Sequence, residues 1–95
     1  TNAYVGLGKI YYEKYKNFSK AKNILERAYE REVNLYGNVP HNLDLLHYLG
    51  MIAVREGRKF DAILSYMDMK NVYAPTPEEN KKKSELYKAI KKMDE

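Results

Sequence analysis

The chain has 95 residues and a mass of 11.2 kDa, the size of one small domain, which excludes a large two-lobed enzyme with an interdomain cleft. Hydrophobic residues make up 44% of it and charged residues 32%, too apolar for a disordered chain, and no apolar run is long enough for a membrane span. Cysteine is absent, which excludes disulfides, thiolate metal sites and cysteine nucleophiles, and we expect a cytoplasmic protein. Five glycines and three prolines are few for short strands and favour helices.

The first two predicted helices carry apolar stripes at helical spacing. The stripe of the first consists of Tyr4, Leu7, Gly8 and Tyr11. The stripe of the second consists of Ala21, Ile24, Leu25 and Ala28. We predict that the second helix begins near Ser19, a good N-cap residue, and runs to about Tyr36. Gly37 then supplies the left-handed position that commonly follows a helix.

Two further helices are predicted between the valine-proline turn and the next proline. The third begins at His41 or Asn42 and stops at Gly57. The fourth opens around Phe60 and runs to about Tyr73, because the alanine-proline step that follows disfavours helix.

The last predicted helix runs from residue 77 to about 92. The run Thr76-Pro77-Glu78-Glu79 combines a threonine cap, a proline at the first helical position and acids at the positive end of the helix dipole. We expect Glu78 to pair with Lys82, and Glu79 with Lys83, one turn apart along a solvated face.

An internal repeat joins the first four helices. Tyr4-x-x-Leu7-Gly8-x-x-Tyr11 aligns with Leu46-x-x-Leu49-Gly50-x-x-Ala53 at an offset of 42 residues. Phe18-x-x-Ala21 likewise aligns with Phe60-x-Ala62, one residue shorter. Small residues let two helices approach closely, while the large residues beside them fill the remaining space. A period of this length is typical of a repeat architecture.

On these positions the chain resembles the tetratricopeptide repeat family, and its spacing is similar to the 42-residue subclass found in kinesin light chains. The resemblance implies an all-α fold, an α-solenoid of antiparallel helix pairs within one domain. Repeat 1 would cover residues 1–38, repeat 2 residues 39–75, and a C-terminal capping helix residues 76–95. Two repeats are fewer than the three that usually make a stable array, so we expect part of a longer array or pairing with a second copy.

Catalytic and metal-binding patterns are weak in this sequence. His41, Asp44 and His47 are three residues apart, which spreads them around a helix rather than converging on one ion. The serines have no glycine elbow or histidine partner near them. We therefore expect no catalytic residue, no metal and no cofactor.

The charge distribution argues against nucleic acid. The formal net charge is +4, but basic and acidic residues are interspersed along the chain, whereas a phosphate-tracking surface needs a concentrated stripe. We expect neither a nucleic-acid nor a membrane partner.

In stacked helix pairs the first helix of each pair lines the concave face, so its side chains outside the packing stripe are the candidate contacts for a bound peptide. These groove candidates are Asn2, Lys9, Tyr12, Glu13, Asp44, His47, Tyr48, Met51 and Arg55. Tyr12 and Tyr48 have an alternative role, packing against a neighbouring repeat. We expect three other tyrosines in the core, namely Tyr4, Tyr11 and Tyr66.

The function expected is that of a noncatalytic interaction module that binds a peptide or protein segment in the groove. One alternative is the peptide-sensing repeat domain of a bacterial regulator or response-regulator phosphatase. Another is a purely architectural role, in which the repeats only stack and self-associate through their exposed ends.

Overall fold

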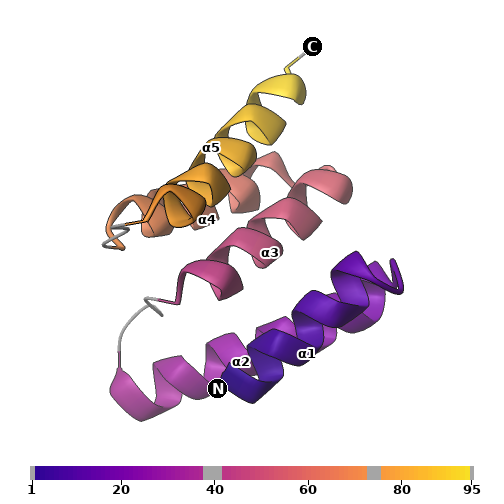
Figure 1. Cartoon of the computed structure of the whole chain (residues 1–95), viewed down its shortest axis with the longest axis vertical. Coiled ribbons are helices and arrows are strands. Elements are labelled where there is room, and N and C mark those ends of the chain that lie inside the picture. The colour runs from indigo at the N-terminus through magenta and orange to yellow at the C-terminus, as the bar shows by residue number, and fades with distance from the viewer. Residues whose placement is uncertain (1, 38–41, 73–75, 95) are drawn as a thin grey trace. The chain divides into compact units, whose positions relative to one another are not determined.

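A computed structural model describes residues 2–37, 42–72 and 76–94, with only the backbone of Asn2 and Tyr36, and this part of the chain is all-helical (Figure 1). Its helices are α1 (Asn2–Glu13), α2 (Phe18–Tyr36), α3 (Leu43–Arg55), α4 (Lys59–Lys70) and α5 (Pro77–Lys92). They belong to two compact units, residues 1–40 and residues 41–95, so the last helix shares a unit with the second helix pair. Within the described ranges, none of the helices combines the length and apolar character needed to cross a bilayer.

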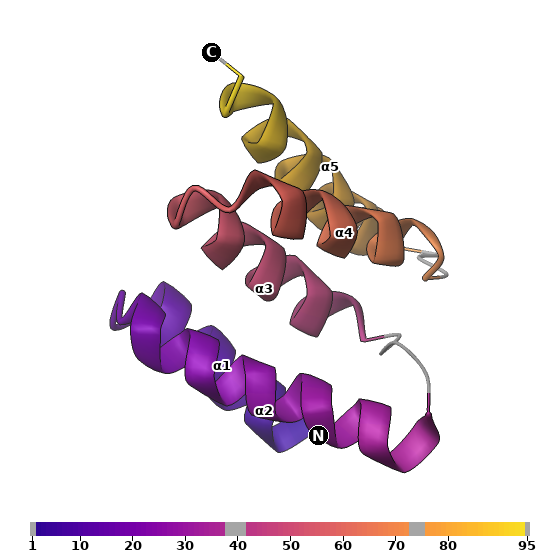
Figure 2. The same ribbon diagram turned by 180° about the vertical axis from the view of Figure 1, so that it is seen from behind.

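Unit 1 is the antiparallel pair α1 and α2, which lie side by side in both views (Figures 1 and 2). Gly8 makes their close approach possible, because a Cβ atom there would lie 2.6 Å from both Cγ and Cδ2 of Leu25. Leu25 is fully buried, together with Ala21 and Ala28 on the same stripe of α2. The stripe predicted for the second helix therefore identifies correctly which face of α2 is buried.

Both ends of α2 are fixed by local hydrogen bonds. The Asn17 side chain accepts a hydrogen bond from the Lys20 amide, 3.2 Å away, so the prediction of Ser19 as the cap is wrong. Asn17 has the non-helical backbone that a cap requires, whereas Ser19 already lies in the first helical turn. At the other end Gly37 has a φ of 72° and its amide donates to the Val33 carbonyl at 2.7 Å, as predicted.

Unit 2 consists of α3, α4 and α5, and α5 packs against both other helices (Figure 2). Gly50 occupies the crowded junction, because a Cβ atom there would lie 2.6 Å from Cδ2 of Leu86 in α5 and 3.2 Å from Cβ of Ser65 in α4. The core of the unit also holds fully buried Ile52 and Met69. Each of the three helices thus contributes to one interior.

The helices of unit 2 begin and end close to the predicted positions. Asn42 is the cap of α3. The helix α4 spans Lys59–Lys70 and residues 71–72 are already non-helical, so the predicted helix is too long at this end, while Tyr73 itself lies outside the described part. The helix α5 spans the predicted 77–92, and its Thr76 side chain accepts a hydrogen bond from the Glu79 amide at 3.2 Å. The strong start signal of this helix is therefore confirmed.

The tyrosines are less buried than expected. Tyr4 is exposed, while Tyr11 and Tyr66 are half-buried, so the prediction that all three form the core is wrong. Tyr66 and Tyr87 pack ring against ring with centroids 5.5 Å apart, and the Lys20 ammonium lies 4.6 Å from the Tyr11 ring. Aliphatic and small residues fill most of the interior instead, and Tyr48 is buried among them, whereas the three tyrosines predicted for the core lie nearer the surface.

Candidate functional site

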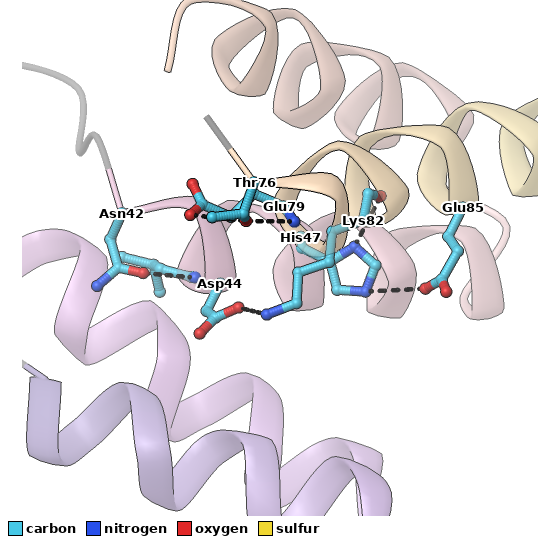
Figure 3. A network of polar contacts seen from close by, with 8 residues as sticks. Asn42, Asp44, His47, Thr76, Glu79, Lys82 and Glu85 are labelled. Atoms are coloured by element: carbon cyan, nitrogen blue, oxygen red, sulfur yellow. Dashed lines mark hydrogen bonds and ion pairs between the residues drawn. The ribbon is translucent and has the colours of Figure 1, made fainter. Parts of the chain in front are cut away.

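A group of polar side chains joins α3 to α5 within unit 2 (Figure 3). We call it the α3–α5 polar cluster and define it as Asp44, His47, Lys82 and Glu85. Two of its members lie on α3 and two on α5. The cluster joins residues of two helices that are distant in sequence, and it contains two of the predicted groove residues, Asp44 and His47.

Two capping residues position the helices that carry the cluster. The Asn42 side chain accepts a hydrogen bond from the Leu45 amide at 3.1 Å, which starts α3 one turn before His47. At the start of α5 the Thr76 hydroxyl also donates to the Glu79 carboxylate at 3.0 Å. In the first turn of each helix a backbone amide that has no partner within the helix donates to the cap side chain. The following turns of α3 and α5 carry the cluster residues, which point toward one another (Figure 3).

The Lys82 ammonium pairs with the Asp44 carboxylate across the two helices. Lys83 also reaches away from its own helix and donates to the Val72 carbonyl at 2.8 Å. The structure thus gives Lys82 and Lys83 partners on other segments, in place of the predicted pairing with Glu78 and Glu79 along α5. This correction follows from the packing of α5 on both α3 and α4, which brings acceptors within reach of the lysines.

His47 is the buried polar side chain of the cluster, with only 4% of its surface exposed. Its Nδ1 donates to the backbone carbonyl of Lys82 at 3.1 Å, which requires the proton to sit on Nδ1. Its Nε2 lies 3.8 Å from a carboxylate oxygen of Glu85, and the Tyr48 ring packs edge-on against the imidazole at 4.8 Å. The imidazole therefore links the α5 backbone to α3.

Burial lowers the pKa of His47 below its ordinary value of 6.5, because desolvation disfavours the charged ring. The negative charge of Glu85 and the hydrogen bond to the Lys82 carbonyl oppose this shift, and neither outweighs the burial. The neutral ring, with Nδ1 as donor, is therefore the form that this environment favours.

The α3 groove candidates divide into covered and accessible residues. His47 and Tyr48 are buried, and Asp44 is half-buried in its pairing with Lys82. The expectation that His47 and Tyr48 line an open surface is therefore wrong, whereas packing, the alternative considered for Tyr48, is what its burial supports. Met51 is half-buried and Arg55 is exposed near the end of the helix.

The α1 candidates are less enclosed. Lys9 is half-buried and Glu13, the last residue of the helix, is exposed. Tyr12 is half-buried, with its ring edge-on to Phe18 at 5.1 Å. Asn2 is the first residue of α1, and its side chain lies outside the described part. Lys9 and Glu13 are therefore the accessible candidates of unit 1.

The chemistry of the polar cluster is that of a closed structural contact. In the residues that the structure describes, every buried side-chain nitrogen or oxygen has a hydrogen-bond partner, and no group of three acidic, histidine or cysteine side chains could hold a metal ion. Lys82 and Glu85 are not among the residues predicted for a site. The sequence indicates only that they are three residues apart and therefore lie on the same face of α5. Comparison with protein-family models, curated proteins and solved structures finds no match to this chain.

Proposed function

We propose that this chain is a noncatalytic protein-interaction module of the tetratricopeptide type, an α-solenoid whose first helices bind a peptide or protein segment. One observation carries the proposal. The two glycines that the repeat alignment equates, Gly8 and Gly50, both lie where a Cβ atom would meet a leucine of a neighbouring helix at 2.6 Å. A repeated need for close helix approach favours a repeat architecture over a coincidence of sequence.

The ligand contacts of this proposal are the accessible candidates on the two first helices. Lys9 on α1 and Arg55 on α3 carry donors suited to carboxylates or backbone carbonyls. Met51 on α3 is a flexible apolar side chain, which adapts to different partners. The proposed partner is therefore a peptide or protein segment with acceptor groups and an apolar side chain, and the module uses no cofactor.

A peptide display library screened against the purified chain tests this proposal. The variants Lys9→Glu and Arg55→Glu should each weaken selected peptides at least about tenfold, which corresponds to about 1.4 kcal/mol. Lys81→Glu is the matched control, because Lys81 is exposed on α5 outside the candidate set. Circular dichroism should show that all three variants remain helical. Unchanged binding by both groove variants would contradict the assigned surface.

A further inference from the structure

A shallow depression lies on unit 1, where the N-terminal turn of α1 meets the C-terminal half of α2. The residues that line it carry apolar, basic, acidic and amide side chains: Tyr4, Arg27, Glu30, Arg31, Asn34 and Leu35. All of them belong to unit 1 and all are exposed, so the depression is complete within that unit.

The lining has an apolar part and a charged edge, in which the two arginines outnumber the single Glu30 carboxylate. Tyr4 and Leu35 expose 43% and 60% of their areas, and together they form the apolar part of the depression. Arg27 and Arg31 lie one helical turn apart, and in the described part of the chain neither has an ion pair. The depression therefore suits an apolar group that is accompanied by negative charge.

The outer face of α4, in unit 2, has this chemistry. Phe60, Leu64 and Met67 follow one another at spacings of four and three, so they form one stripe on the helix. Their exposed fractions are 72%, 44% and 54%, whereas Ala62 and Met69 on the opposite side are fully buried. The stripe is thus an apolar face directed away from the core of its own unit.

An acidic edge accompanies this stripe. Asp61 and Asp68 are seven residues apart and therefore lie along the same edge of α4. Asp61 already contacts Arg58 at 2.7 Å through one carboxylate oxygen, and 51% of its side chain is exposed. A carboxylate accepts several donors, so the edge can also meet guanidinium groups from another chain.

We propose that the two faces bind each other between copies of this chain, with the α4 stripe of one copy seated in the unit 1 depression of the next. The contact buries Leu64 and its neighbours against Tyr4 and Leu35, and it places the acidic edge beside Arg27 and Arg31. Two α4 stripes packed antiparallel about a twofold axis would instead bring identical acidic edges together, which is repulsive.

A contact of this kind joins different patches on the two partners, so each copy retains one unused face and can add another. The expected product is a concentration-dependent series of oligomers rather than a closed dimer. Because ionic contacts border the interface, added salt weakens the association. This inference concerns surfaces outside the proposed peptide groove, and it holds or fails independently of that function.

Two variants that each block one face provide the test. Leu64→Lys/Met67→Lys disables the α4 stripe, and Arg31→Glu/Leu35→Lys disables the depression; all four residues are exposed, so the fold should persist. Sedimentation velocity from about 10 µM to about 1 mM should show association of the unmodified chain, with each variant alone weakened at least about tenfold. An equimolar mixture of the two variants should form a one-to-one complex, because each supplies the face that the other lacks.

The control variant is Asn23→Lys, an exposed position of α2 outside the depression, which should associate as the unmodified chain does. Three results would overturn the proposal. They are a monomer throughout the concentration range, a mixture of the two variants that stays monomeric, and a depression-blocked variant that still dimerises through α4.

Discussion

The two units use the same leucine-glycine dipeptide at different junctions. In unit 1 Gly8 admits Leu25 from α2, the second helix of its own pair. In unit 2 Gly50 admits Leu86 from α5, a helix outside the pair, together with the Cβ of Ser65 from α4. A glycine at an aligned position therefore marks close approach, but the sequence alignment alone does not say which helix makes it.

The units also differ in how polar groups contribute. Contacts between α1 and α2 include the Lys20 ammonium over the Tyr11 ring and the approach of Leu25 to Gly8, whereas α3 and α5 are joined by an ion pair and a buried imidazole. Unit 1 contains no histidine. Mild acidification should consequently act on unit 2 through His47, which has no counterpart in unit 1.

The largest effect is expected from truncating the leucines at the two junctions. Leu86→Ala should cost about 2–5 kcal/mol in unit 2, and Leu25→Ala a similar amount in unit 1, because both side chains are fully buried. Hydrogen exchange read by mass spectrometry should show loss of protection in α3–α5 for the first variant and in α1–α2 for the second. Equal loss in both units from Leu86→Ala would contradict the division into two units.

Replacing the junction glycines by alanine should change the stability of each unit less than truncating the leucines. Alanine at either site gains about 1 kcal/mol of helix propensity but incurs about 1–3 kcal/mol of overpacking. The collision at Gly8 involves the branch-point Cγ of Leu25, while at Gly50 it involves the terminal methyls of Leu86, which rotate more easily. Urea denaturation should therefore rank Gly8→Ala as the more destabilising variant.

Gly6→Ala is the control for both glycines. A Cβ atom at Gly6 has no heavy atom within 4 Å, so only the propensity gain should remain and the variant should be slightly more stable. A destabilised Gly6→Ala variant would show that the helix backbone, rather than the leucine contact, sets the effect.

Acidification should destabilise unit 2 selectively. The folded-state pKa of His47 is lowered by burial, so the unfolded chain binds the proton more readily. The stability from neutral His47 is fully present above the unfolded pKa of about 6.5, and it is lost as the pH falls below that value toward the folded pKa. NMR-detected exchange in α3 and α5 at descending pH measures this loss, with α1 and α2 as the internal reference.

His47→Asn retains an amide that can donate to the Lys82 carbonyl but does not titrate. The variant should lose the acid-induced weakening of α5 seen near and below pH 6.5 in the unmodified chain. Identical pH dependence in both proteins would assign the effect to other groups.

The smallest effect is expected from the Asp44–Lys82 pair, because both side chains are partly solvated. Asp44→Asn and Lys82→Met should each cost about 0.2–1 kcal/mol, and a double-mutant cycle should show coupling that decreases with added salt. Lys81→Met, at the exposed neighbouring position, should change stability less than Lys82→Met. A coupling energy of zero would show that the Asp44–Lys82 pair does not stabilise the fold.

Local signals explain what could be predicted from the sequence. The five helices, the Thr76 start of α5 and the Gly37 end of α2 depend on residues within one turn of each boundary. The sequence does not determine the start of α2, because Asn17 and Ser19 are both good caps and the cap is the one that adopts the non-helical backbone.

The polar cluster could not be predicted because its partners are distant in sequence. Lys82 lies 38 residues from Asp44, and the spacing along α5 allows Glu78 equally well as a partner. His47 is likewise polar in sequence but buried in the structure, since the Lys82 carbonyl satisfies its Nδ1. The partners of Lys82 and His47 depend on where α5 packs, and the apolar periodicity of a helix does not specify that position.

The caps described for α2, α3 and α5 have a kinetic consequence. Each joins residues only three apart, namely Asn17 with Lys20, Asn42 with Leu45, and Thr76 with Glu79. Such bonds can form before any tertiary contact, and they lower the cost of nucleating each helix. We expect these helices to be partly populated in the unfolded chain, so that folding becomes a fast docking of preformed segments rather than a search for long-range pairings.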